Sequence, residues 1–95
     1  MTNRIRDILR AVETMHSCTA KHDSSQVVME QFRGQTVWDG VVEVFNLTGH
    51  PQAKRCYAWS FIDNEEPRYV AVLELPPVDS ACSAVRAAIA SGQQK

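Results

Sequence analysis

The sequence lacks a long hydrophobic run, a large excess of either charge and a dense set of cysteines. A membrane-spanning helix needs about 20 consecutive apolar residues, so we expect no membrane partner. The three cysteines are odd in number and widely spaced, unlike the framework of a secreted disulfide-rich domain. We therefore expect reduced thiols and a cytoplasmic location. The net charge of −1 argues against nucleic-acid binding, which depends on clustered Lys and Arg.

What the sequence does contain is typical of one folded domain. Its 95 residues are 44% hydrophobic and 22% charged, which is ordinary for a globular protein. We expect residues 1–95 to form a single α+β domain, with 93–95 as a flexible tail. At this length, folding buries only about 60–65% of the unfolded chain's surface, so the core is thin and a partner subunit would add to it.

Apolar periodicity predicts a helix near each end of the chain. Near the N-terminus, apolar residues recur every three or four positions, as on one helix face: Ile5, Ile8, Leu9, Val12 and Met15. Near the C-terminus, Asp79 or Ser80 is expected to cap an alanine-rich helix, which Gly92 ends.

Between the helices, residues 36–47, 53–62 and 68–75 are rich in β-branched and aromatic side chains and predict three strands. Residues 26–32 fit a strand or a helix, and their β-branched residues favour a strand. Residues 16–25 have no period and are interpreted as a loop. Gly40, inside a strand, indicates a bulge or a close backbone approach. The prediction is an antiparallel sheet of three or four strands flanked by an N-terminal and a C-terminal helix.

Both faces of this sheet carry apolar side chains, although a sheet with one wet face alternates apolar and polar residues. Two short helices are expected to cover only one face. We therefore expect the aromatic face to meet a second subunit, in a homodimer or higher oligomer, or a small-molecule or protein ligand. On this view Trp59→Ala weakens the oligomer more than the monomer. The residues predicted to bind there are Trp38, His50, Arg55, Tyr57, Trp59 and Phe61.

No pattern in the sequence predicts a catalytic residue, a metal site or a cofactor. Three metal-ligating residue types follow the first helix at a spacing that fits no zinc pattern: His16, Cys18 and His22. Glu43 lies among apolar residues of a strand, where Arg55 or Arg68 would pair with it. A small enzyme with a histidine and carboxylate site stays an alternative, and the roles of His50 and Glu43 stay open.

Two resemblances extend this interpretation. The run VWDGVVEVFNLTGHPQAKRCYAW at 37–59, with AVLELPPVDSACSAVRAAI at 71–89, resembles a group of short bacterial proteins of the mobile-cassette type that has no known activity. The likeness covers residues 35–89. It implies a bacterial cytoplasmic protein and lends no catalytic residue.

The second resemblance concerns the order of the elements. Helix, strands and helix, with a Gly-His-Pro loop before a strand, are similar to the double-stranded-RNA-binding domain. That family grips phosphates with lysines that open its last helix, whereas this segment reads PPVDSACSAVR, with an acid and no lysine. Nucleic-acid binding is therefore an alternative function, through Arg4, Arg6, Arg10, Lys54 and Arg55.

Overall fold

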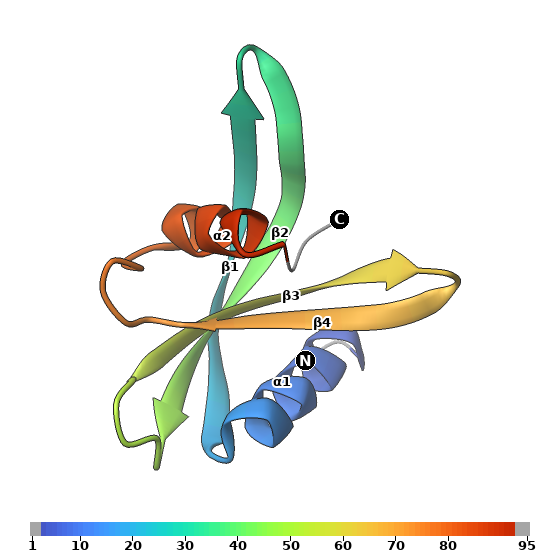
Figure 1. The fold of residues 1–95 in the computed structure, drawn as a ribbon. Helices are drawn as coiled ribbons and strands as arrows, with labels where there is room; N and C mark the ends of the chain where they lie inside the picture. The colour runs from blue at the N-terminus through green and yellow to red at the C-terminus, as the bar shows by residue number, and fades with distance from the viewer. Residues whose placement is uncertain (1–2, 93–95) are drawn as a thin grey trace.

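The structure, a computed structural model, describes residues 3–92, and the predicted tail at 93–95 lies outside the described residues. Its elements are α1 (Asn3–His16), β1 (Thr19–Phe32), β2 (Gln35–Thr48), β3 (Arg55–Asp63), β4 (Glu66–Leu73) and α2 (Ala81–Ala90). The strands form one antiparallel sheet in the order β1-β2-β3-β4 (Figure 1). The predicted α+β fold, an antiparallel sheet flanked by two helices, is confirmed with four strands. Within residues 3–92, no helix has the length and apolar character to cross a membrane.

The first strand is longer than the sequence predicted. Residues 26–32 are a strand, as their β-branched residues favour, but the loop predicted at 16–25 is wrong because β1 already begins at Thr19. The polar stretch from Thr19 to Ser25 pairs with the apolar second half of β2, with a register shift between His22 and Ser24. Backbone pairing with a strongly β-forming partner thus overrides the low strand propensity of this stretch.

The two hairpins of the sheet share only a short pairing. β1 and β2 pair along their whole length, whereas β2 pairs with β3 only where Glu43–Asn46 lies against Arg55–Ala58. Beyond this junction the hairpins diverge, and the β1–β2 hairpin projects away from β3 and β4 (Figure 1). We call residues 26–42, the part of this hairpin beyond the junction, the arm.

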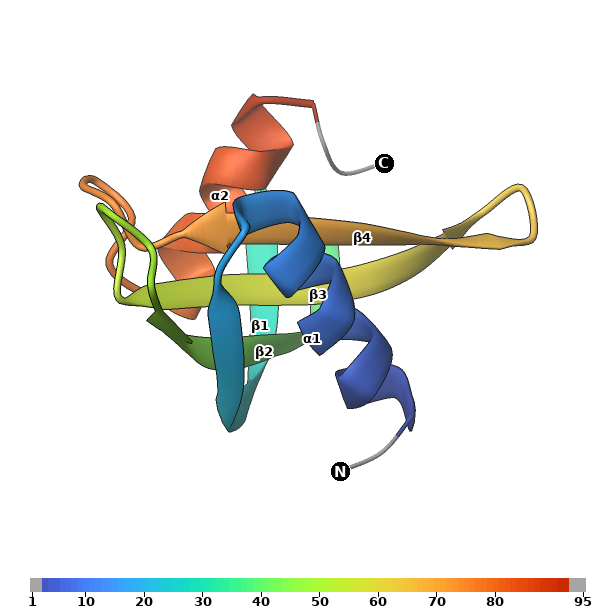
Figure 2. The ribbon, with the colours of Figure 1, turned by 90° about the horizontal axis from the view of Figure 1, so that it is seen from below.

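The two helices lie on opposite faces of the sheet. α2 covers the face with Trp59 and Val70, and α1 covers the face with Cys56 and Ala58. Figure 2, the view from below, has α1 nearest the viewer and α2 on the other side of β4. Neighbouring residues of a strand point to opposite faces of the sheet, so each of the two rows of apolar side chains packs against one of the helices. The expectation that the helices cover only one face is therefore wrong.

Local signals position α2 and the indole of Trp38. Ser80, one of the two residues predicted to cap this helix, is the N-cap of α2. Its side chain and that of Ser83 form a capping box. Gly40 pairs regularly with Val28, so it is not a bulge. The close contact at Gly40 is with a side chain and not with another backbone segment, because a Cβ at Gly40 would lie 3.2 Å from the Trp38 ring.

Candidate functional site

The aromatic side chains predicted to meet a partner lie in the core beneath α2. Tyr57 is 2% exposed and Trp59 is 1% exposed. The Trp38 and Trp59 rings meet edge to face with their centroids 5.4 Å apart, and Phe61 packs at the margin of this cluster. The prediction of an exposed aromatic face is wrong, because α2 crosses that face and buries the two rings on which the prediction depended.

His50 closes the turn before β3. Its Nδ1 atom accepts hydrogen bonds from the backbone N–H of Gln52 at 3.1 Å and of Ala53 at 2.9 Å. A ring nitrogen that accepts carries no proton, so this geometry fixes the neutral tautomer with its proton on Nε2. The side chain therefore has a structural role, which the sequence left open.

The phenol of Tyr57 meets both Glu74 and the side chain of Arg55 at the edge of the core. The Tyr57 hydroxyl donates a hydrogen bond to Glu74. Burial, together with the hydrogen bond and the charge of Glu74, raises the pKa of Tyr57 to about 12, while Arg55 opposes the shift. The predicted contact residues Arg55 and Tyr57 are therefore engaged within the chain.

The basic residues of the nucleic-acid alternative do not form one stripe on α1. At 100° per residue, Arg6 and Arg10 lie about 40° apart around the helix, whereas Arg4 lies about 160° from Arg6. Arg4 turns toward the sheet and pairs with Glu43, its Nη1 atom 3.4 Å from Oε2. Lys54 is exposed just before β3. Of the three arginines on α1, Arg6 and Arg10 therefore lie on one side of the helix and Arg4 lies on another.

Glu43, on β2, is the one buried charged residue within 3–92 and is 1% exposed. Its Oε1 atom lies 2.9 Å from Nε2 of His22 and accepts a hydrogen bond from the Ser25 hydroxyl. The guanidinium of Arg4 lies at Oε2. The sequence predicted an arginine partner but the wrong one, since the partner comes from α1 and Arg68 instead faces Asp63 and Glu66 at 3.8 and 3.6 Å.

This cluster contains the residue types of a nucleophilic triad without its geometry. In a triad the carboxylate orients the imidazole through one ring nitrogen, and the other nitrogen takes the serine proton. Here Glu43 and Ser25 both face Nε2 of His22, at 2.9 and 3.5 Å. We interpret the cluster as a satisfied buried carboxylate that ties α1 to the β1–β2 hairpin. Over residues 3–92, no three His, Cys, Asp or Glu side chains are arranged to hold a metal ion.

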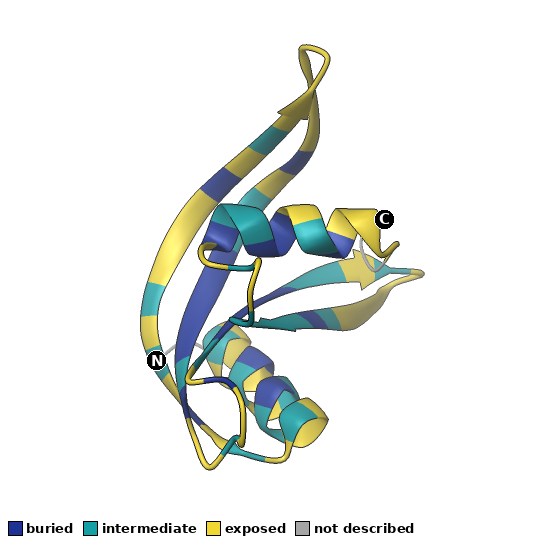
Figure 3. Ribbon diagram, turned by 60° about the vertical axis from the view of Figure 1, so that its left-hand side comes forward, coloured by how far each residue is buried: buried dark blue, intermediate teal, exposed yellow. Residues whose placement is uncertain are grey.

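The arm carries the largest group of exposed apolar side chains. Val27 is 85% exposed, and Met29, Phe32 and Val37 are each at least half exposed. Figure 3 shows the outer half of the arm mostly exposed, with buried positions only at intervals. Val27 and Met29 alternate with Val28, which packs under α2, so these two side chains lie on the face of the arm away from α2.

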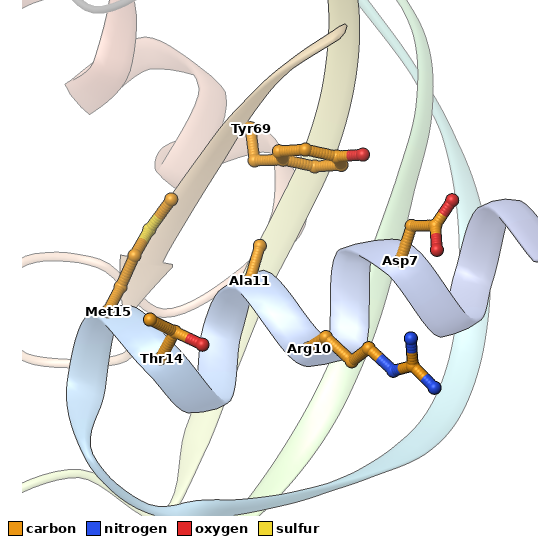
Figure 4. A pocket seen from close by; sticks show the side chains of 6 residues that line it. All are labelled: Asp7, Arg10, Ala11, Thr14, Met15 and Tyr69. Atoms are coloured by element: carbon orange, nitrogen blue, oxygen red, sulfur yellow. The ribbon is translucent and has the colours of Figure 1, made fainter.

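Open grooves lie beside both helices, and two of the larger ones can be placed by their lining residues. One, of about 400 Å³, lies between the end of the arm and the last turn of α2, where Phe32, Val37 and Ile89 meet the ion pair of Glu30 with Arg86 at 2.6 Å. The other, of about 380 Å³, lies between α1 and β4 (Figure 4). There the Tyr69 ring lies over Ala11, with the remaining lining residues along α1: Asp7, Arg10, Thr14 and Met15.

No family model, curated protein or solved structure matches this chain. The resemblances to short bacterial proteins and to the double-stranded-RNA-binding domain therefore stay predictions.

Sequence reasoning missed the arm as a surface. The signal was present in QVVMEQF, where Val27 and Met29 alternate with Val28 and Glu30. Read as a strand, this segment has apolar residues on both faces, which is the same pattern that identified the two-sided core of β2 and β3. The pattern could not show that the arm is exposed. The arm lies outside the helix-covered sheet because the β2–β3 pairing is short, and that short pairing has no signature in local sequence.

Proposed function

We propose that the protein is a non-catalytic interaction module that self-associates through its arm. The observation that carries this proposal is the set of apolar side chains exposed there: Val27, Met29, Phe32 and Val37. Large exposed apolar patches are uncommon on monomeric proteins and mark contact surfaces. Here Val27 and Met29 lie on the face away from α2, and Phe32 and Val37 lie beside its last turn. Symmetric homodimers are the commonest assemblies that cover them.

The architecture of the arm supports the same proposal. Its two strands pair only with each other, and α2 packs on one face through Val28 and Trp38. A two-stranded ribbon is marginally stable in water and needs a further strand or a packed face. α2 supplies one packed face, and a second copy against the arm would add a further contact that shields Val27 and Met29.

The proposal includes a bacterial cytoplasmic setting, as the resemblance to short bacterial proteins implies. Cys18, Cys56 and Cys82 are free thiols, which supports a reducing compartment. Self-association is favoured over nucleic-acid binding because Arg4 is occupied by Glu43, and over catalysis because His22, Ser25 and Glu43 lack triad geometry.

Light scattering on size-separated protein tests the proposal with a matched pair of variants. Val27→Thr/Met29→Gln keeps the size of both side chains and makes them polar. If each lost apolar contact contributes about 1 kcal/mol per copy, the loss is about 4 kcal/mol per dimer, and the dimer should weaken by about a thousandfold. Ile62→Thr is the control, because Ile62 is 72% exposed but lies at the end of the other hairpin. If the control weakens association as much as the arm variant does, the arm is not the contact surface.

A further inference from the structure

The two edges of the sheet differ in how well they resist pairing with another strand. β1 and β4 are the edge strands. Natural edge strands are protected by proline, by charged side chains or by bulges, because their unpaired N–H and C=O groups otherwise recruit a further strand. The composition of each edge therefore indicates which one is available.

The β4 edge is protected. It begins with Glu66, Pro67 and Arg68, so its first residues combine a proline with two charges. Arg68 also faces Asp63 at 3.8 Å and Glu66 at 3.6 Å, which gathers charge at the open end of this hairpin. A strand added here would have to pair beside a residue without an N–H group and beside solvated ions.

The β1 edge is unprotected from Ser24 to Phe32. This stretch of nine residues contains no proline and no glycine. One register shift lies just before it, between His22 and Ser24, and a second, between Glu30 and Gln31, has its extra residue on β2 and not on β1. Its one charged residue is Glu30, which Arg86 already neutralises at 2.6 Å. A segment of low charge, with Val27, Val28 and Phe32 as its strand-favouring residues, is typical of one that accepts another strand.

We infer that a second copy of the chain occupies this edge, so that the two β1 strands pair antiparallel about a two-fold axis and the two sheets become one of eight strands. This inference rests on the proposed self-association and names its geometry. The paired edge is about 30 Å long, at about 3.3 Å per residue. It adds backbone hydrogen bonds to the small contact area that the apolar side chains of the arm provide.

The chemistry of β1 fits pairing with itself. Because Glu30 is the only charge between Ser24 and Phe32, two copies place like charges opposite each other in only one register, with Glu30 on the axis. A two-fold axis perpendicular to the sheet keeps corresponding faces on the same side. Val27 and Met29 of both copies then gather on one face of the joined sheet, away from α2, where they shield one another.

Amide hydrogen exchange followed by NMR tests the pairing without assuming a register. In an edge strand, every second N–H points outward and exchanges rapidly, whereas pairing protects it. The protein is measured at concentrations below and above its dimer dissociation constant. The outward amides of Ser24–Phe32 should slow by more than about tenfold on association, and the outward amides of β4 serve as the internal control and should not change.

The outcomes separate this inference from the proposed function. Concentration-dependent protection confined to β1 supports the pairing. A dimer in which the outward β1 amides stay fast, or in which β4 is protected instead, overturns the pairing and leaves self-association standing. A molar mass that stays at that of one chain at every concentration overturns both.

Discussion

Replacing His22 by phenylalanine should lower the stability of the fold by an amount that the Glu43 cluster allows us to estimate. His22→Phe keeps an aromatic ring against Phe45, whose centroid lies 5.5 Å from that of His22. It removes the hydrogen bond of 2.9 Å to the buried carboxylate of Glu43. The variant therefore isolates the polar contact from the packing contact.

The expected loss is about 2 kcal/mol in the free energy of unfolding. Hydrogen bonds to charged groups contribute about 1.5–3 kcal/mol, and breaking a fully buried pair costs about 3–5 kcal/mol. We expect a loss within the lower of these two ranges, because Glu43 keeps Ser25 and Arg4 as hydrogen-bond partners. A loss of this size is a large fraction of the roughly 5–15 kcal/mol that stabilises a small domain.

A second variant tests whether the loss comes from the stranded carboxylate. In His22→Phe/Glu43→Met the buried charge is gone, and an apolar replacement of a buried ion pair is often neutral or stabilising. Arg4 can then return to water, since its side chain is already half exposed. We expect the double variant to lie within about 1 kcal/mol of the wild type.

Urea denaturation followed by tryptophan fluorescence measures these values, because Trp38 and Trp59 both lie in the core. Arg68→Gln is the control: its ion pairs are exposed, so its loss should stay below about 0.5 kcal/mol. The reasoning is refuted if His22→Phe unfolds like the wild type, or if the double variant is less stable than the single one.

Two further predictions concern the core beneath α2. Because the folded pKa of Tyr57, about 12, lies above the ordinary value of about 10, the stability it contributes is present below pH 10 and is lost as the pH rises toward 12. An absorbance titration of Tyr69→Phe, which leaves Tyr57 as the remaining tyrosine, should have its midpoint near 12, and a midpoint near 10 contradicts the burial of the phenol. Trp59→Ala should destabilise the monomer by about 3–5 kcal/mol, contrary to the effect on the oligomer expected from sequence. Chemical denaturation of dilute protein measures it, and a loss under about 1 kcal/mol would place Trp59 outside the core.

Local sequence was sufficient for most elements of the fold. The period of the apolar residues identified α1, and the capping serine identified the start of α2. The dense Val, Trp and Phe residues identified β2, because β-branched and aromatic side chains fit a pleated, buried surface. Even the two-sided apolar character of β3 was evident, since residues 57 and 59 alternate with apolar residues 56 and 58.

What the sequence could not show depends on contacts between distant residues. Apolar residues on both faces of a strand require two covering layers, but they do not say whether a helix of the same chain or another subunit supplies the second. Arg4 and Glu43 are 39 positions apart, so their pairing follows from where α1 packs. The polar start of β1 is a strand only because β2 lies beside it. The arm, in turn, is exposed because the β2–β3 pairing ends at Glu43.

Sedimentation equilibrium of the unmodified protein over a wide concentration range tests self-association most directly. The molar mass should rise from the 10.6 kDa of one chain to twice that value as the concentration increases. A mass that stays at 10.6 kDa up to hundreds of micromolar would mean that the exposed arm does not bring two copies together.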